Sequence, residues 1–146
     1  MMKLTSVLLT LFLFTSNCNS TTTATPESIE QSIAALVEKN SYEEALDLLK
    51  QEDPSKPEIV ALLVDTHYKY GIYLEYYEKT QTMRDKMTSA LRQYIMALKL
   101  NPSHEGSIAE IQQIISIYKT FPDRTLPADI HRELSALGLD GGVASE

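Results

Sequence analysis

The chain has a single cysteine among its 146 residues, and this scarcity excludes two kinds of small protein. One cysteine can form neither an intramolecular disulfide nor a cysteine-based zinc cage. The chain also lacks a run of basic residues, and its formal net charge is −7. Because affinity for nucleic acid depends largely on neutralising phosphates, this charge argues against a nucleic-acid partner.

Glycine and proline are also few, at 5 and 6 residues, in a chain that is 43% hydrophobic and 23% charged. These values are typical of a soluble globular chain, and the length fits one domain or a domain with a tail. The apolar run from Leu4 to Phe14 is interrupted by Thr5, Ser6 and Thr10. It is shorter than the roughly 20 apolar residues that a membrane-spanning helix needs.

The N-terminus has the pattern of an export signal. Lys3 precedes the apolar run, and Thr15-Ser16-Asn17-Cys18 follows it. This arrangement resembles a bacterial lipoprotein signal, in which the cysteine is lipidated and becomes the first residue of the mature chain. The resemblance implies a signal peptide over 1–17, then the lipidated Cys18 and a flexible tether over 18–25. The alternative is a plain secretory leader with a chance cysteine.

Apolar residues recur at intervals of three and four after the tether, which predicts an all-α fold of about six helices. The expected helical domain spans residues 26–138, and residues 139–146 are expected to be a disordered tail. Thr25 is the expected cap of the first helix, and Ser41 and Glu44 are expected to form a capping box for the second. The later helices are predicted at about 57–79, 82–100, 103–121 and 127–137.

The helix before Asn101-Pro102 has the clearest pattern. Ala90, Tyr94 and Ala97 share one face, so a neighbouring helix can approach the alanines while Tyr94 fills the gap between them. Pro102 cannot continue the helix. Gly71 lies in the middle of the preceding predicted helix, where glycine costs about 1 kcal/mol relative to alanine. We therefore expect another helix to approach closely at Gly71.

This pattern resembles the second helix of a tetratricopeptide (TPR) repeat, which has alanine, a large residue four positions on, alanine three later and proline five later. Part of it occurs twice at a spacing of 45 residues, because Tyr42, Ala45, Leu46, Leu49 and Pro57 correspond to Met87, Ala90, Leu91, Tyr94 and Pro102. The resemblance implies antiparallel helical hairpins stacked as a short TPR-like α-solenoid. It also implies that the chain binds another protein.

Five of the eight tyrosines fall between Tyr68 and Tyr77. On one continuous helix the apolar stripe that faces the core would carry Tyr70, Tyr73 and Tyr77. Another single face would carry Asp65, Tyr68, Ile72, Glu75 and Tyr76. In TPR domains this face of the first helix lines the groove that binds peptides, so the resemblance implies a partner-binding site here. Tyrosine suits binding surfaces, and the acidic residues favour a basic or amphipathic segment of a protein partner. The alternative is that these residues pack against the preceding hairpin.

No motif indicates a catalytic site, a metal site or a cofactor. The histidines His67, His104 and His131 fall on different predicted helices or their ends, without the spacing of metal ligands, and there is no glycine-rich phosphate loop. His67 is expected at the edge of the core. We therefore expect no enzyme activity.

The expected function is that of a protein-protein interaction adaptor, exported and anchored as a lipoprotein at the bacterial cell envelope, on its periplasmic or surface side. One alternative is a structural homodimer that uses an exposed isoleucine face formed by Ile114 and Ile117. Another is a small envelope enzyme or ligand-binding domain with a tyrosine-rich cavity.

Overall fold

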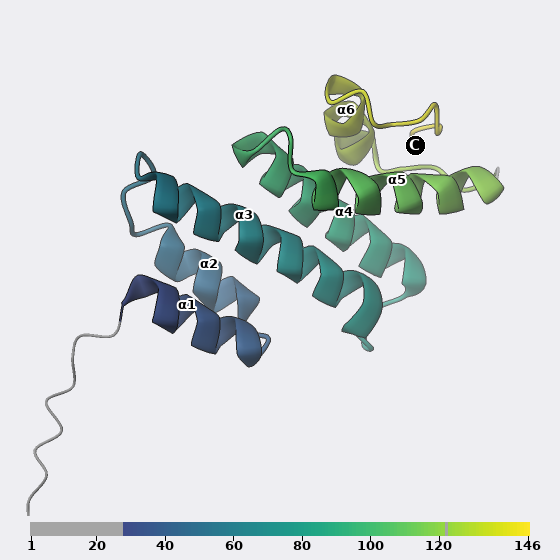
Figure 1. The fold of residues 1–146 in the computed structure, drawn as a ribbon. Coiled ribbons are helices and arrows are strands. Elements are labelled where there is room, and N and C mark those ends of the chain that lie inside the picture. The colour runs from purple at the N-terminus through teal and green to yellow at the C-terminus, as the bar shows by residue number, and fades with distance from the viewer. Residues whose placement is uncertain (1–27, 122) are drawn as a thin grey trace, which may run out of the picture.

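The computed structural model describes residues 28–121 and 123–146, which form six α-helices and one π-helical turn (Figure 1). These are α1 (Ile29–Glu38), α2 (Tyr42–Leu49), α3 (Pro57–Ile72), the π-helical turn η1 (Tyr73–Tyr77), α4 (Met83–Leu100), α5 (Glu105–Thr120) and α6 (Ala128–Ala136). The predicted all-α fold is confirmed, and these described residues contain no β-strand.

The predicted signal peptide, Cys18 and the tether lie outside the described residues. Within the described part of the chain, no helix is long and apolar enough to cross a membrane.

Hydrogen bonds at both ends of α1 fix its length. Ser28 and Gln31 form a capping box, in which the Gln31 N–H donates to the Ser28 hydroxyl at 3.3 Å and the Ser28 N–H donates to the Gln31 side chain at 3.1 Å. The helix therefore begins at Ile29, and Thr25 is not its cap. At the other end Asn40 adopts a φ of +58°, and the N–H groups of Asn40 and Ser41 close the last turn.

The predicted capping box between Ser41 and Glu44 does not form. The Ser41 N–H donates to the carbonyl of Leu36 at 2.9 Å, so it is not available to the Glu44 side chain. The Ser41 hydroxyl makes no capping hydrogen bond either. The end of α1 thus uses the donor that the start of α2 would have needed.

The long helix α3 lies at the centre of the arrangement. It packs against α2 on one side and α4 on the other, and α1 also contacts it. Beyond α4, the helices α5 and α6 both pack on α4 (Figure 1). The helices from α1 to α5 therefore pack mainly on their neighbours along the chain, whereas α6 packs on α4.

The face of α4 that the sequence identifies is fully buried. Ala90, Tyr94 and Ala97 have no exposed surface, and they face neighbouring helices as predicted. The corresponding residues of the earlier copy, Tyr42, Ala45, Leu46 and Leu49, are buried as well. The buried apolar residues form a large cluster around α4 and a separate small one of Ile33, Ala45, Leu49 and Ile59.

Gly71 allows α3 and α4 to approach closely. A Cβ atom at Gly71 would lie 2.7 Å from Cδ1 of Tyr94, well inside van der Waals contact. The ring of Tyr94 thus occupies the space that any larger residue at position 71 would need. The predicted close approach at Gly71 is confirmed.

The π-helical turn changes which tyrosines are buried. The Glu78 N–H donates to the Tyr73 carbonyl at 2.9 Å, which closes a wider turn than an α-helix has. The residues after Tyr73 are therefore rotated from their α-helical positions. Tyr77, which the sequence pattern assigns to the core stripe, is 64% exposed.

The predicted isoleucine face of α5 is not on the surface. Ile114 has 0% exposure, and Ile117 packs against the same large cluster. Ile114 is thus buried, and Ile117 is partly buried, within the same chain. The face on which the homodimer alternative depends is therefore used within the monomer.

The tail expected to be disordered, residues 139–146, packs against the rest of the chain. Val143 is buried, and Leu126 exchanges backbone hydrogen bonds of 2.9 Å with Ala144 and Glu146. Gly138, with a φ of +70°, ends α6 and allows the chain to turn back. The tail has a single large apolar residue besides Leu139, so no periodic pattern predicts its docking.

We expect Gly71→Ala to lower the free energy of unfolding by about 1–3 kcal/mol, because overlap with Tyr94 outweighs the better helix propensity of alanine. Urea unfolding followed by circular dichroism measures this loss. Gly106→Ala is the matched control, since its Cβ would meet the ring of the partly exposed Tyr68 at 3.0 Å. Its effect should be small. Equal stability of Gly71→Ala and the wild type would contradict the helix contact.

Candidate protein-binding surface

The five residues predicted to bind a partner have different surroundings in the structure. Asp65 is exposed and forms an ion pair of 2.8 Å with Lys69. Ile72 lines a small cavity on the side of α3 that faces α2. Tyr68, Glu75 and Tyr76 face α5 or α4 and make side-chain contacts there. The expected single face is thus divided among three neighbourhoods.

Tyr68 holds the start of α5. Its ring meets the His104 ring edge-on at a centroid distance of 5.0 Å and lies 6.1 Å from the ring of Tyr94. The Gly106 backbone also lies against it, since a Cβ there would be 3.0 Å from the Tyr68 ring. Tyr68 therefore packs against the start of α5, whereas the sequence predicts either an open groove or packing on the preceding hairpin.

Glu75 lies in a hydrogen-bond network that joins η1, α4 and α5 and extends from the core to the surface. The residue is 7% exposed, and its carboxylate accepts a hydrogen bond of 2.9 Å from the Tyr94 hydroxyl. The Gln113 amide donates to Glu75 at 3.5 Å and to the Tyr76 hydroxyl at 2.6 Å. The Tyr76 hydroxyl in turn donates to Glu110 at 3.1 Å.

Burial raises the pKa of Glu75, and the charge of Glu110 raises it further, while the Tyr94 hydrogen bond opposes both effects. Burial also raises the pKa of Tyr76 to about 12, with a contribution from Glu75. Neither Glu75 nor Glu110 forms an ion pair with a residue of the described ranges. The network is therefore acidic, and its donors are neutral groups, namely tyrosine hydroxyls and the Gln113 amide.

Three further tyrosines join α2 to the end of α3. The rings of Tyr42 and Tyr70 stack at 5.1 Å with an interplanar angle of 8°, and Tyr73 lies 5.4 Å from Tyr42. The Tyr70 hydroxyl donates to Glu43 at 3.1 Å. The sequence pattern assigns Tyr70 and Tyr73 to the core but does not reveal Glu43 as a partner, because the two elements meet only in the folded chain.

Tyr76 and Tyr77 lie on η1 between these two groups, and they are 50% and 64% exposed. Large exposed aromatic side chains are typical of protein-binding surfaces, and π-helical turns occur often at functional sites. We define the η1 surface as Tyr76 and Tyr77 together with the neighbouring Glu110. It retains Tyr76 from the predicted site and adds two residues that the pattern missed.

The histidines have structural contacts. His67 is buried with its Nδ1 at 2.8 Å from the Gln93 side chain, and burial lowers its pKa, in agreement with the predicted place at the core edge. His104 caps α5 by accepting the Ser107 N–H at 3.2 Å. In the described residues no group of three or more His, Cys, Asp or Glu side chains is placed to hold a metal ion.

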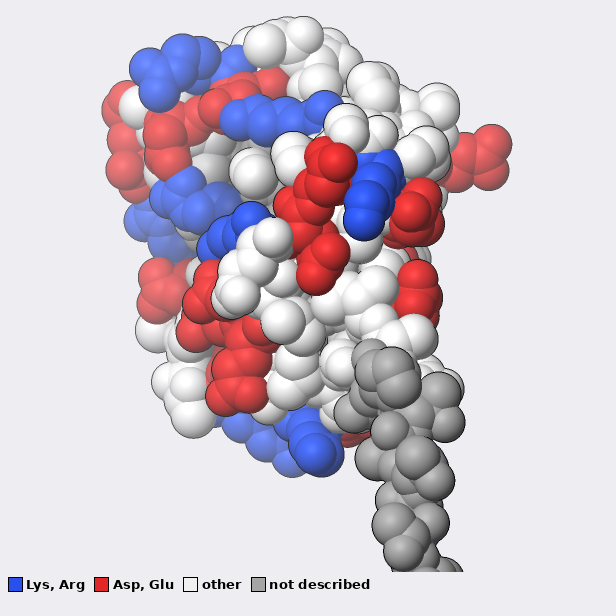
Figure 2. All heavy atoms as spheres, turned by 90° about the vertical axis from the view of Figure 1, so that its left-hand side faces the viewer, with Lys and Arg blue, Asp and Glu red and all other residues white. Residues whose placement is uncertain are grey.

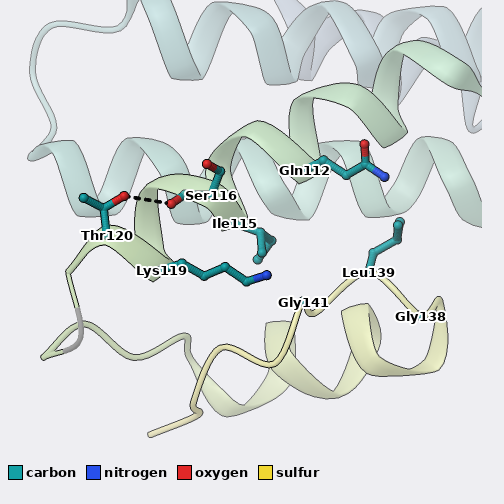
Figure 3. A pocket seen from close by; sticks show the side chains of 8 residues that line it. All are labelled: Gln112, Ile115, Ser116, Lys119, Thr120, Gly138, Leu139 and Gly141. Carbon is teal, nitrogen blue, oxygen red and sulfur yellow. Dashed lines mark hydrogen bonds between the residues drawn. The ribbon is translucent and has the colours of Figure 1, made fainter.

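A larger cavity of about 530 Å³ lies away from the tyrosines, between α5 and the loop after α6 (Figure 3). Lys119 extends along it, and Gly141 lies against Ile115 at its edge (Figure 3). Its lining mixes Lys119 with neutral polar groups such as Ser116 and Thr120, the latter bonded to the Ser116 carbonyl at 3.1 Å. This lining does not specify the chemistry of a ligand.

Charge does not mark a single binding face on the side drawn in Figure 2. Acidic and basic side chains are interspersed there, with uncharged areas between them. This side therefore carries no broad electrostatic field of one sign, so a charged partner would be attracted there only by small groups of like-charged residues.

We expect the pH dependence of stability to reveal Glu75. Because its pKa in the folded state is raised above the ordinary value of 4.5, the stability it contributes is present below that pH and lost as the pH rises through the raised pKa. Glu75→Gln keeps an oxygen that can accept the Tyr94 hydrogen bond, but it has no proton to release, so the variant does not lose this stability as the pH rises. The variant should therefore gain stability relative to wild type between about pH 4 and pH 7.

Thermal unfolding at a series of pH values measures this difference, with circular dichroism confirming native helicity at each pH. A difference between the two proteins that stays constant with pH, or that changes in favour of wild type as the pH rises, would show that Glu75 is not destabilised by burial.

Comparison of the chain with protein-family models, curated proteins and solved structures finds no match. The resemblance to TPR repeats consequently depends on the helix patterns in this chain alone.

Proposed function

We propose that this protein is a TPR-like adaptor that binds a basic or amphipathic segment of another protein through the η1 surface. We also propose that it is exported and anchored by lipid at Cys18 in the bacterial cell envelope. The observation that carries the binding proposal is the pair of exposed tyrosines, Tyr76 and Tyr77, beside carboxylates that lack an ion-pair partner in the described residues.

The order of helix contacts supports a short solenoid. α1 contacts α3, and α4 contacts α6, in addition to the contacts between consecutive helices from α1 to α5. Contacts between every second helix are what stacked hairpins produce, because each hairpin lies on the one before it. Such stacking leaves a surface along one set of helices open to partners, and α3 belongs to that set in this proposal.

The chemistry of the η1 surface supports a positively charged partner. Tyrosine offers rigid apolar area and a hydroxyl at the same time, so it anchors many protein interfaces. Glu110 and Glu75 add negative charge next to Tyr76. A basic or amphipathic segment would match both the apolar rings and the carboxylates.

We expect Tyr76→Ala with Tyr77→Ala to reduce recovery of the native partner at least tenfold, because central aromatics carry most of the affinity in protein interfaces. Crosslinking and affinity recovery from native membranes measure the loss, and melting is measured on the same variant. The control is Met96→Ala with Phe121→Ala, which removes two other exposed apolar side chains. Equal recovery with both double variants would rule out the η1 surface as the binding site.

We expect Cys18→Ser to release the protein from the membrane fraction or to leave its precursor uncleaved, because the lipidated cysteine would be both anchor and processing site. Fractionation and immunoblotting of cells that express either form provide the measurement. If the variant stays in the membrane fraction and is processed like the wild type, Cys18 is not the anchor.

A further inference from the structure

A cavity of about 380 Å³ opens between the start of α2 and the end of α3 with η1. Tyr42, Tyr70 and Tyr73 contribute aromatic surface to its lining, and three carboxylates also line it, those of Glu43, Glu44 and Glu78. No lysine or arginine is among the described residues around it. The cavity thus combines apolar surface with negative charge.

Hydrogen bonds inside the chain leave this negative charge in place. The Tyr70 hydroxyl donates to Glu43. Burial is the main cause that raises the pKa of Tyr70 to about 12, and Glu43 contributes to the rise, so the phenol stays neutral. Glu78 accepts from the backbone and hydroxyl of Thr80, and these bonds hold its pKa below the ordinary value. Neutral donors therefore stabilise the carboxylates without cancelling their charge.

Two lysines whose charges act on lining residues, Lys69 on Tyr42 and Lys86 on Glu78, do not neutralise the cavity. Lys69 forms its ion pair of 2.8 Å with Asp65, which does not line the cavity. Lys86 acts on Glu78 through space, but it neither lines the cavity nor forms an ion pair with that residue. An incoming cation would therefore meet carboxylates that have no ion-pair partner among the described residues.

We infer that this cavity receives one lysine or arginine side chain of the protein partner. The methylene stem would lie against the tyrosines, and the charged end would lie among Glu43, Glu44 and Glu78. Lysine and arginine combine these two properties, since each carries a charged group on an apolar stem. This inference rests on the proposed function, because it takes the partner to be a protein segment.

A second cavity of about 210 Å³ extends the first. The two share Asn40, Tyr42 and Tyr73, and the second adds Ile72 and the exposed Tyr77. It has no charged residue among its described lining residues. A partner segment with a basic residue next to an apolar one would therefore fill both cavities, and Tyr77 would connect them to the η1 surface.

The test uses two labelled peptides and the mature full-length chain. One peptide contains lysine-leucine pairs separated by glycine and serine, and the other has norleucine in place of each lysine. Norleucine keeps an apolar stem but lacks the ammonium group. Fluorescence anisotropy should give at least tenfold tighter binding of the lysine peptide. Equal affinity for the two peptides, or no binding of either at millimolar concentration, would overturn the inference.

Two matched variants locate the binding. Glu43→Gln with Glu44→Gln removes two first-turn acids of α2, while Glu58→Gln with Glu105→Gln removes the first-turn acids of α3 and α5. Both pairs change net charge and helix-end electrostatics alike. We expect at least a tenfold loss of lysine-peptide affinity for the first pair and less than twofold for the second. Equal losses would mean that only net charge matters, and the inference would be wrong.

A titration of the wild type with tyrosine-labelled protein needs no substitution. The NMR signals of Tyr42, Tyr70 and Tyr73 should shift as lysine peptide is added, while that of Tyr118 in the α5 core should not. Shifts confined to other tyrosines would overturn the inference.

The outcome for the proposed function is read separately. Suppose that recovery of the native partner depends on Tyr76 and Tyr77, but that peptide affinity is unchanged by Glu43→Gln with Glu44→Gln. That result would contradict only this inference. Recovery that is independent of both tyrosines would remove the proposed function.

Discussion

The contact between Gly71 and Tyr94 sets the distance between α3 and α4, and the other helices are placed by that pair. Because glycine has no side chain, the Tyr94 ring can lie against the backbone of α3. The same ring brings its hydroxyl to Glu75, so one residue supplies both the apolar contact and the polar one. α5 then meets α3 through Tyr68 and η1 through Gln113.

A buried carboxylate at this position has a structural consequence. Removing Glu75 from water is unfavourable, and its hydrogen bonds with Tyr94 and Gln113 offset part of that unfavourable free energy. Those bonds are directional, so they require η1 and α5 to keep a fixed relation to α4. The acidic network therefore orients the helices more specifically than apolar packing alone would.

The sequence predicts the helices and their main packing well because both depend on periodic side chains. The stripe of Ala90, Tyr94 and Ala97 and the isolated Gly71 give strong local signals, and the structure places them as expected. The capping of α1 and α2 is harder to predict, because Ser28 and Ser41 are equally good caps by residue type. Only the folded chain shows that the Ser41 N–H is already used by α1.

The candidate site is less predictable than the fold for a different reason. A helical wheel assumes 100° per residue, so a single π-helical turn misplaces every residue after Tyr73. This explains why Tyr77 is exposed although the pattern assigns it to the core. The partners of Tyr70 and Tyr76, which are Glu43 and Glu110, lie 27 and 34 residues away in the chain. No local pattern connects them.

The division of the core into two clusters affects how the molecule moves. The small cluster under α1 and α2 has only four buried members, and the stacked Tyr42 and Tyr70 provide one of the bridges from this hairpin to α3. Elements with few buried contacts open at lower free energy than the rest of a protein, so this hairpin is suited to separate as a cooperative unit. A molecule bound at the tyrosine bridge would hold the closed form and slow amide exchange throughout α1 and α2. Occupation of one side-chain cavity would thereby be reported by α1, a helix that the bound group does not touch.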